Sequence, residues 1–223
     1  MLSDRREVQF PAKDEPEVIL SGLLFTPETL KKPFVCVLVH PWGLLGGSRG
    51  NTFLYADRLS KKFGIQCLIF DCRGVGNSSG KASFNCSAEV ADVIGACDWV
   101  TSNLSKPILL IGSSAGAAIA GSALDKVSQV LAYIGIGYTF GWLSSLIFGR
   151  HYDAISKSMK PKLFIMGTED GFTSVSQLKS RLKHMQNAEM KLIDGVGHFS
   201  LESSTYASKT VELIAEYVDT LTF

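Results

Sequence analysis

The sequence predicts an α/β protein with a doubly wound, mostly parallel sheet of about eight strands. Short apolar, β-branched segments alternate along the chain with segments of helical periodicity. The runs FVCVLV and ILLIG are apolar at every position, which is typical of parallel strands covered by helices on both faces. No repeat, charge block or low-complexity linker interrupts the 223 residues, so we expect a single domain over 1–223.

The strands are predicted from short apolar runs bounded by turn residues. A weaker candidate at Glu7–Phe10 opens the chain, and we expect the N-terminal edge of the sheet to be mixed or antiparallel. The remaining strands are expected at Val18–Phe25, Phe34–Val39, Gln66–Phe70, Ile108–Ile111, Val130–Ile136, Lys162–Met166 and Glu189–Ile193.

Helices are predicted between these strands from their apolar stripes and end signals. The first follows Asn51 and ends at Gly64, and the second begins at Glu89 with Ser87 as a candidate cap. The later helices are expected over Ala115–Leu124, over Val175–His184 after Thr173 and Ser174, and at the C-terminus with Val211, Ile214, Ala215, Val218 and Leu221 on one stripe.

The segment between Lys126 and Arg150 carries no charge, and VLAYIGIGYTFGWLSSLIFG is long enough to cross a membrane. Its four glycines, its serines and Thr139 favour a buried strand over Val130–Tyr138 followed by a small apolar cap over 139–158. We therefore expect no stable membrane span, although such a cap could contact lipid or an acyl chain. The apolar side chains of this cap are Phe140, Trp142, Leu143, Leu146, Ile147 and Phe148.

The composition of the chain indicates which partners and which cellular compartment to expect. The chain is 46% hydrophobic and 19% charged, and its net charge of +1 provides no electrostatic reason to expect nucleic acid. Five cysteines without a C-x-x-C pair, three of them in apolar runs, predict buried reduced thiols. The start MLSDRREVQF is too charged for a signal peptide, so we expect a cytoplasmic protein.

The strand at Ile108–Ile111 runs into Gly112-Ser113-Ser114-Ala115-Gly116, which matches G-x-S-x-G with Ser114 at its centre. Glycines two positions either side let a strand and a helix meet closely while the central residue adopts a strained turn. The Ser114 hydroxyl would then project at the sheet edge, with the N–H of Ala115 ready to donate to an oxyanion. An ordinary tight turn is the alternative, while a dinucleotide loop is disfavoured because G-x-G-x-x-G is absent.

Three further loops follow strands and so belong at the same sheet edge. In His40-Pro41-Trp42-Gly43 the proline has no N–H, so Trp42 is the favoured second oxyanion donor and His40 is interpreted as structural. Asp170 is preferred over Glu169 as the acid after Lys162–Met166, and His198 is the base in Gly195-Val196-Gly197-His198. The remaining histidines, His151 in the cap region and His184 on a helix, fit a base less well.

These residues resemble the α/β-hydrolase superfamily, in which Ser114, Asp170 and His198 stand in the nucleophile–acid–base order. The run Asp71-Cys72-Arg73-Gly74-Val75-Gly76-Asn77-Ser78 resembles a D-x-R-G-x-G-x-S turn of these enzymes, whose Asp and Arg pin the loop. The chain is similar to compact hydrolases near the dienelactone hydrolases and lysophospholipase-like esterases, with a serine where dienelactone hydrolases carry cysteine.

The resemblance implies a serine hydrolase of carboxylic esters or thioesters that works through an acyl-enzyme, without a metal or organic cofactor. The apolar cap favours a small-molecule substrate with an apolar acyl or aryl group, and simple packing of a lid is the alternative reading. Amide or peptide cleavage would use the same residues. The competing function is a non-catalytic binding or scaffold protein on the same fold.

Overall fold

The computed structural model describes residues 3–140 and 142–221, without the side chains of residues 142–147 and 150. The expected apolar side chains of Trp142, Leu143, Leu146 and Ile147 therefore lie outside the described residues. Eight strands form one sheet in the order β1-β2-β4-β3-β5-β6-β7-β8. Their bounds are β1 Ser3–Pro11, β2 Ile19–Pro27, β3 Val35–Val39, β4 Gln66–Phe70, β5 Ile108–Ser113, β6 Val130–Ile136, β7 Lys162–Gly167 and β8 Ala188–Ile193.

The mostly parallel sheet is confirmed, and so is its mixed N-terminal edge. Strands β3 to β8 pair in parallel, while β2 pairs antiparallel with both β1 and β4. The weak candidate at Glu7–Phe10 belongs to the full strand β1, whose alternating burial is that of an edge strand covered on one face. The carboxyl ends of β3, β5, β6, β7 and β8 meet at one edge of the sheet.

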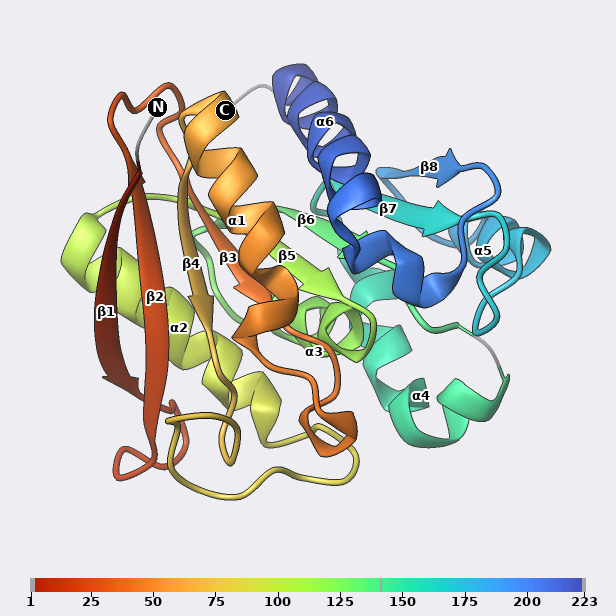
Figure 1. The fold of residues 1–223 in the computed structure, drawn as a ribbon. Coiled ribbons are helices and arrows are strands. Elements are labelled where there is room, and N and C mark those ends of the chain that lie inside the picture. The colour runs from red at the N-terminus through yellow and green to blue at the C-terminus, as the bar shows by residue number, and fades with distance from the viewer. Residues whose placement is uncertain (1–2, 141, 222–223) are drawn as a thin grey trace.

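In the described part of the chain, six α-helices cover the two faces of the sheet (Figure 1). The helices α1 and α6 pack on one face, and α2, α3, α4 and α5 pack on the other. Their bounds are α1 Arg49–Phe63, α2 Glu89–Leu104, α3 Ala115–Ala123, α4 Trp142–Lys157, α5 Val175–Leu182 and α6 Ser204–Thr220. Two short 3₁₀ helices, η1 (Gly43–Leu45) and η2 (His198–Glu202), lie in loops at the carboxyl edge.

The core is split by the sheet into two apolar layers. In β3, Val35, Val37 and Val39 contribute to the layer under α2 and α3, while Cys36 and Leu38 contribute to the layer under α1 and α6. Every residue of β3 is buried, as expected for a central parallel strand. All five cysteines are free and buried, which confirms the prediction of reduced thiols.

The helix ends show where the sequence signals succeeded and failed. Gly64 ends α1 in the left-handed conformation, as predicted, and Ser174 begins α5 by accepting a hydrogen bond from Gln177 N–H. The assignment of Ser87 as the cap of α2 is wrong. Ser87 is exposed, and the helix begins after Ala88 with no side-chain cap.

The uncharged segment forms β6 and α4. The strand β6 lies between β5 and β7 in the sheet. The helix α4 packs against α3, and its side chains Phe148 and Ile155 are buried in the core. Within the described part of the chain, no helix has the length and apolar character needed to cross a membrane. The assignment of 139–158 as a cap stays a prediction.

Candidate active site

Ser114 lies at a sharp turn between the end of β5 and the start of α3. Its backbone has φ 54° and ψ −122°, a conformation that a residue with a side chain rarely adopts. The turn is close-packed, because a Cβ at Gly116 would lie 2.2 Å from His40 O and one at Gly112 would lie 2.3 Å from Gly116 O. The glycine spacing of G-x-S-x-G is therefore a steric requirement of this turn.

A chain of hydrogen bonds joins Ser114, His198 and Asp170. The distance from Ser114 Oγ to His198 Nε2 is 2.9 Å, and that from His198 Nδ1 to Asp170 Oδ2 is 2.6 Å. The other carboxylate oxygen, Asp170 Oδ1, accepts from the main-chain N–H groups of Phe172 and Thr173 at 2.8 and 3.0 Å. Because the carboxylate is the acceptor, Nδ1 carries the proton and Nε2 is free to accept one from the serine.

The competing acid and the other histidines lie elsewhere. Glu169 is exposed next to the buried Asp170. His184 is exposed after α5, and His151 is buried against Ser122 Oγ at 2.6 Å and Asn85 O at 2.9 Å. The geometry thus brings together the residues preferred from the sequence.

His40 has a structural environment, as predicted. Its Nε2 accepts from Cys72 N–H at 3.0 Å, and its Nδ1 donates to Pro41 O at 2.6 Å. Burial lowers the pKa of His40, which favours the neutral ring that both hydrogen bonds require. The ring thereby links the loop that carries Trp42 to the turn that begins at Asp71.

Trp42 and Ala115, the two expected oxyanion donors, lie close to the serine. Ala115 opens α3 directly after Ser114, and Trp42 precedes η1 after β3. Both residues line the cavity described below, and neither N–H has a hydrogen-bond acceptor among the residues that the structure describes. The indole of Trp42 packs edge-on against Phe84 and Phe148 at 5.7 and 5.4 Å.

Ser114 and His198 open into a cavity of about 460 Å³, within the usual size range of small-molecule sites. Its wall is mostly apolar and aromatic, with a few polar side chains. The apolar wall consists of Pro41, Trp42, Leu45, Ile136, Phe148, Phe172, Phe199 and Leu201, and the polar side chains are Asn51, Ser113, Ser114, Thr139, His198 and Glu202. Phe172 and Phe199 contact His198 from two sides, at 4.5 and 5.3 Å between ring centroids.

Sequence reasoning missed Glu202, a carboxylate in the cavity wall. Ser113 Oγ donates to its Oε1 at 2.7 Å, and Asn51 Nδ2 donates to its Oε2 at 2.8 Å. The 3₁₀ helix that carries both His198 and Glu202 is held by Tyr55, whose hydroxyl donates to Leu201 O at 2.8 Å. Nothing local in the sequence marks Glu202, whereas Phe172 and Phe199 could have been found as neighbours in sequence of Asp170 and His198.

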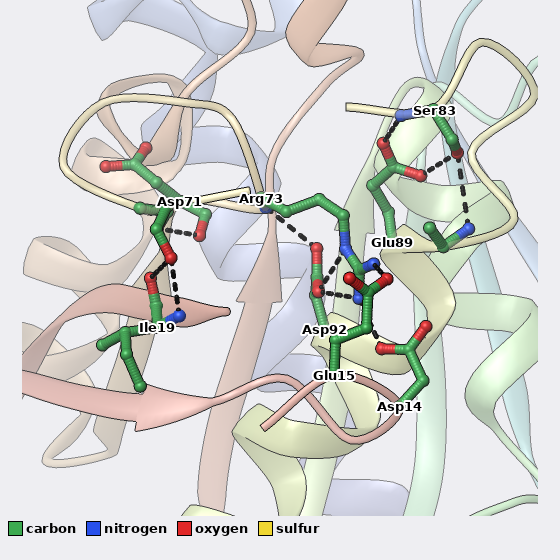
Figure 2. A network of polar contacts seen from close by, with 11 residues as sticks. Asp14, Glu15, Ile19, Asp71, Arg73, Ser83, Glu89 and Asp92 are labelled. Atoms are coloured by element: carbon green, nitrogen blue, oxygen red, sulfur yellow. Dashed lines mark hydrogen bonds and ion pairs between the residues drawn. The ribbon is translucent and has the colours of Figure 1, made fainter. Parts of the chain in front are cut away.

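Charged side chains hold the turn that follows β4, which confirms the structural reading of Asp71 and Arg73. Figure 2 shows the contacts of Arg73. Arg73 is buried and donates from its main chain and its guanidinium to Asp92 of α2, and it also pairs with Asp14 and Glu15. Asp71 accepts from the first N–H of α1, that of Arg49, at 2.8 Å. Through these contacts the turn connects α1 and α2, which lie on opposite faces of the sheet, next to the loop that carries Trp42.

The start of α2 is held by the same network. Glu89 in the first helical turn reaches back and accepts from the N–H and the hydroxyl of Ser83 (Figure 2). A carboxylate near a helix N-terminus is also favoured by the helix dipole. The Ser83 hydroxyl in turn accepts from Ala88 N–H at 3.3 Å, so Ser83 and not Ser87 bonds to the main chain just before this helix.

The fold closely matches solved structures of hydrolases. An alpha-beta serine hydrolase homologue from Coxiella burnetii has a TM-score of 0.80 at 23% identity, with 98% of each chain covered. An α/β serine hydrolase without lid from Xanthomonas campestris has a TM-score of 0.80 at 18% identity, covering 100% of this chain and 99% of that one. An esterase from Pyrococcus furiosus has a TM-score of 0.77 at 20% identity, covering 97% and 92%. No family model and no curated protein matches the sequence.

Proposed function

The chain has the α/β-hydrolase fold, and we propose that it is a serine hydrolase of carboxylic esters or thioesters. The observation that carries the proposal is the continuous hydrogen-bonded line from Ser114 through His198 to Asp170, which opens into a cavity. The names of the solved hydrolases and esterases agree with this reading.

The mechanism follows from the hydrogen bonds. Ser114 Oγ attacks the acyl carbonyl while His198 Nε2 takes its proton, and Asp170 keeps Nδ1–H oriented and stabilises the imidazolium. The N–H groups of Ala115 and Trp42 hold the tetrahedral oxyanion, each lowering the barrier by roughly 3 kcal/mol in comparable sites. His198 then protonates the leaving alcohol or thiol, and water, activated by the same ring, releases the acid.

The cavity supports an apolar acyl or aryl group. Aromatic and aliphatic side chains form most of its wall, including Phe148 of α4, which belongs to the predicted cap. We expect p-nitrophenyl esters from acetyl to palmitoyl to show an optimum in chain length, because a cavity of about 460 Å³ holds only a limited acyl chain.

A fluorophosphonate probe tests the proposal, since it bonds covalently to an activated serine. We expect the wild type to be labelled and Ser114→Ala to be unlabelled. Ser113→Ala is the matched control, because the Ser113 hydroxyl donates to Glu202 and not to His198, and it should keep its label.

Two outcomes contradict the proposal. A folded wild type that is neither labelled nor active on any ester of the series would support the non-catalytic binding function. Labelling that persists in Ser114→Ala and disappears in Ser113→Ala would move the nucleophile to Ser113.

A further inference from the structure

Glu202 places a carboxylate in the wall of the active-site cavity. It ends the 3₁₀ helix η2, which starts at His198, and its oxygen atoms are bonded to Ser113, the residue before Ser114, and to Asn51. The carboxylate therefore lies close to the reacting serine without taking part in the Ser114–His198–Asp170 line.

Both side chains that donate hydrogen bonds to Glu202 are neutral, so no cation is bonded directly to its carboxylate among the described residues. No ion pair to Glu202 is found among the described residues, and the described lining of the cavity contains neither lysine nor arginine. Burial, and then the charge of Glu202, raise the pKa of the neighbouring Tyr55, and Arg58 opposes them. A negative charge in a partly enclosed, mostly apolar cavity attracts a cationic group more strongly than it would in water.

The carboxylate is fixed in place before any ligand arrives. Asn51, in the first turn of α1, accepts from Ser48 N–H through Oδ1 at 3.0 Å and donates to Glu202 through Nδ2 at 2.8 Å. Ser113, at the end of β5, holds the other oxygen. The side chain of Glu202 therefore has little conformational freedom left to lose when a ligand binds.

Aromatic rings complete an environment suited to a cation. Trp42, Phe172 and Phe199 line the same cavity as Glu202, and Phe172 and Phe199 meet edge to face at 5.7 Å. The face of an aromatic ring attracts an ammonium ion. Aromatic rings combined with a carboxylate therefore suit ammonium groups that water hydrates only weakly.

We infer that the cavity binds an ester whose acyl or alcohol part carries an ammonium group, with Glu202 as the residue that selects the positive charge. The inference rests on the proposed hydrolase function and specifies its substrate class. An anionic ester, by the same argument, is disfavoured because the cavity would hold two like charges.

The test compares an acylcholine with the 3,3-dimethylbutyl ester of the same acid, which has nearly the same shape but no charge. We expect the wild type to prefer the choline ester roughly ten-fold in kcat/KM. In Glu202→Gln this preference should fall to about one.

Two control variants separate charge from structure. Glu169→Gln removes an exposed carboxylate outside the cavity wall and should leave the ten-fold preference intact. Glu202→Asp keeps the charge and should retain most of the preference. A structural role, in which Glu202 only ties Ser113 to η2, would lower kcat/KM for both esters by the same factor and overturn the inference.

The failures of the two proposals are distinguishable. A wild type that takes the fluorophosphonate label and hydrolyses both esters equally would refute the charge selection and leave the hydrolase intact. A wild type that is neither labelled nor active on either ester would refute both.

Discussion

His198 is held between two groups that define its chemistry. Its Nδ1 lies 2.6 Å from Asp170 Oδ2, and its Nε2 lies 2.9 Å from Ser114 Oγ. Asp170 is itself oriented by two main-chain N–H groups, whereas the adjacent Glu169 is exposed. At the residue scale the preference for Asp170 therefore follows from burial and hydrogen bonding and not from carboxylate chemistry, which the two residues share.

Asp170→Asn should lower kcat/KM for a p-nitrophenyl ester by about 10³- to 10⁴-fold, because an amide no longer enforces the tautomer with a proton on Nδ1. Glu169→Gln should change kcat/KM by less than about three-fold. Steady-state kinetics on both variants measures this, and the reverse ranking would make Glu169 the acid.

At the scale of elements, the turn after β4 joins parts of the chain that the sheet alone leaves apart. Arg73 and Asp92 are both buried, and the guanidinium also reaches Asp14 and Glu15 on the loop between β1 and β2 (Figure 2). Burial raises the pKa of Asp92 even though Arg73 beside it favours the ionised carboxylate. The charge of Asp92 is thus tolerated only because its partner is present.

Arg73→Met should lower the free energy of unfolding by about 3–5 kcal/mol, because it leaves the buried Asp92 without its counterion. The double variant Arg73→Met, Asp92→Leu should regain part of this loss. Urea denaturation followed by circular dichroism measures both.

The matched control is the exposed pair of Lys13 and Asp98, in which Lys13→Ala should cost no more than about 1 kcal/mol. An Arg73→Met protein as stable as the wild type would show that the network does not stabilise the fold.

At the scale of the whole molecule, the sheet divides the interior into two apolar layers, and the five cysteines are spread through both. Burial raises the pKa of the Cys86 thiol to about 12, and burial also raises the pKa of the Cys72 and Cys97 thiols. A raised thiol pKa means that the protonated, unreactive form dominates at pH 8. The thiols therefore report on the integrity of the whole core.

Native protein at pH 8 should react negligibly with a disulfide reagent such as Ellman's reagent. In about 6 M guanidinium, which unfolds even very stable domains, five thiols should become exposed and react. At intermediate denaturant the reaction should follow the loss of secondary structure seen by circular dichroism. A thiol that reacts rapidly without unfolding would contradict its burial.

The sequence by itself determined the order of the strands, the order of the helices other than α4, and the backbone of the reacting turn. Apolar runs such as FVCVLV and the glycines around Ser114 act on residues near them in the chain, so their consequences can be deduced locally. That β2 runs antiparallel to β4, that Ser87 does not cap α2, and that Glu202 lies in the cavity were decided by the tertiary structure. Ser113 and Glu202 are 89 residues apart, and their side chains meet only because η2 packs against β7, α1 and α6 at this edge of the sheet.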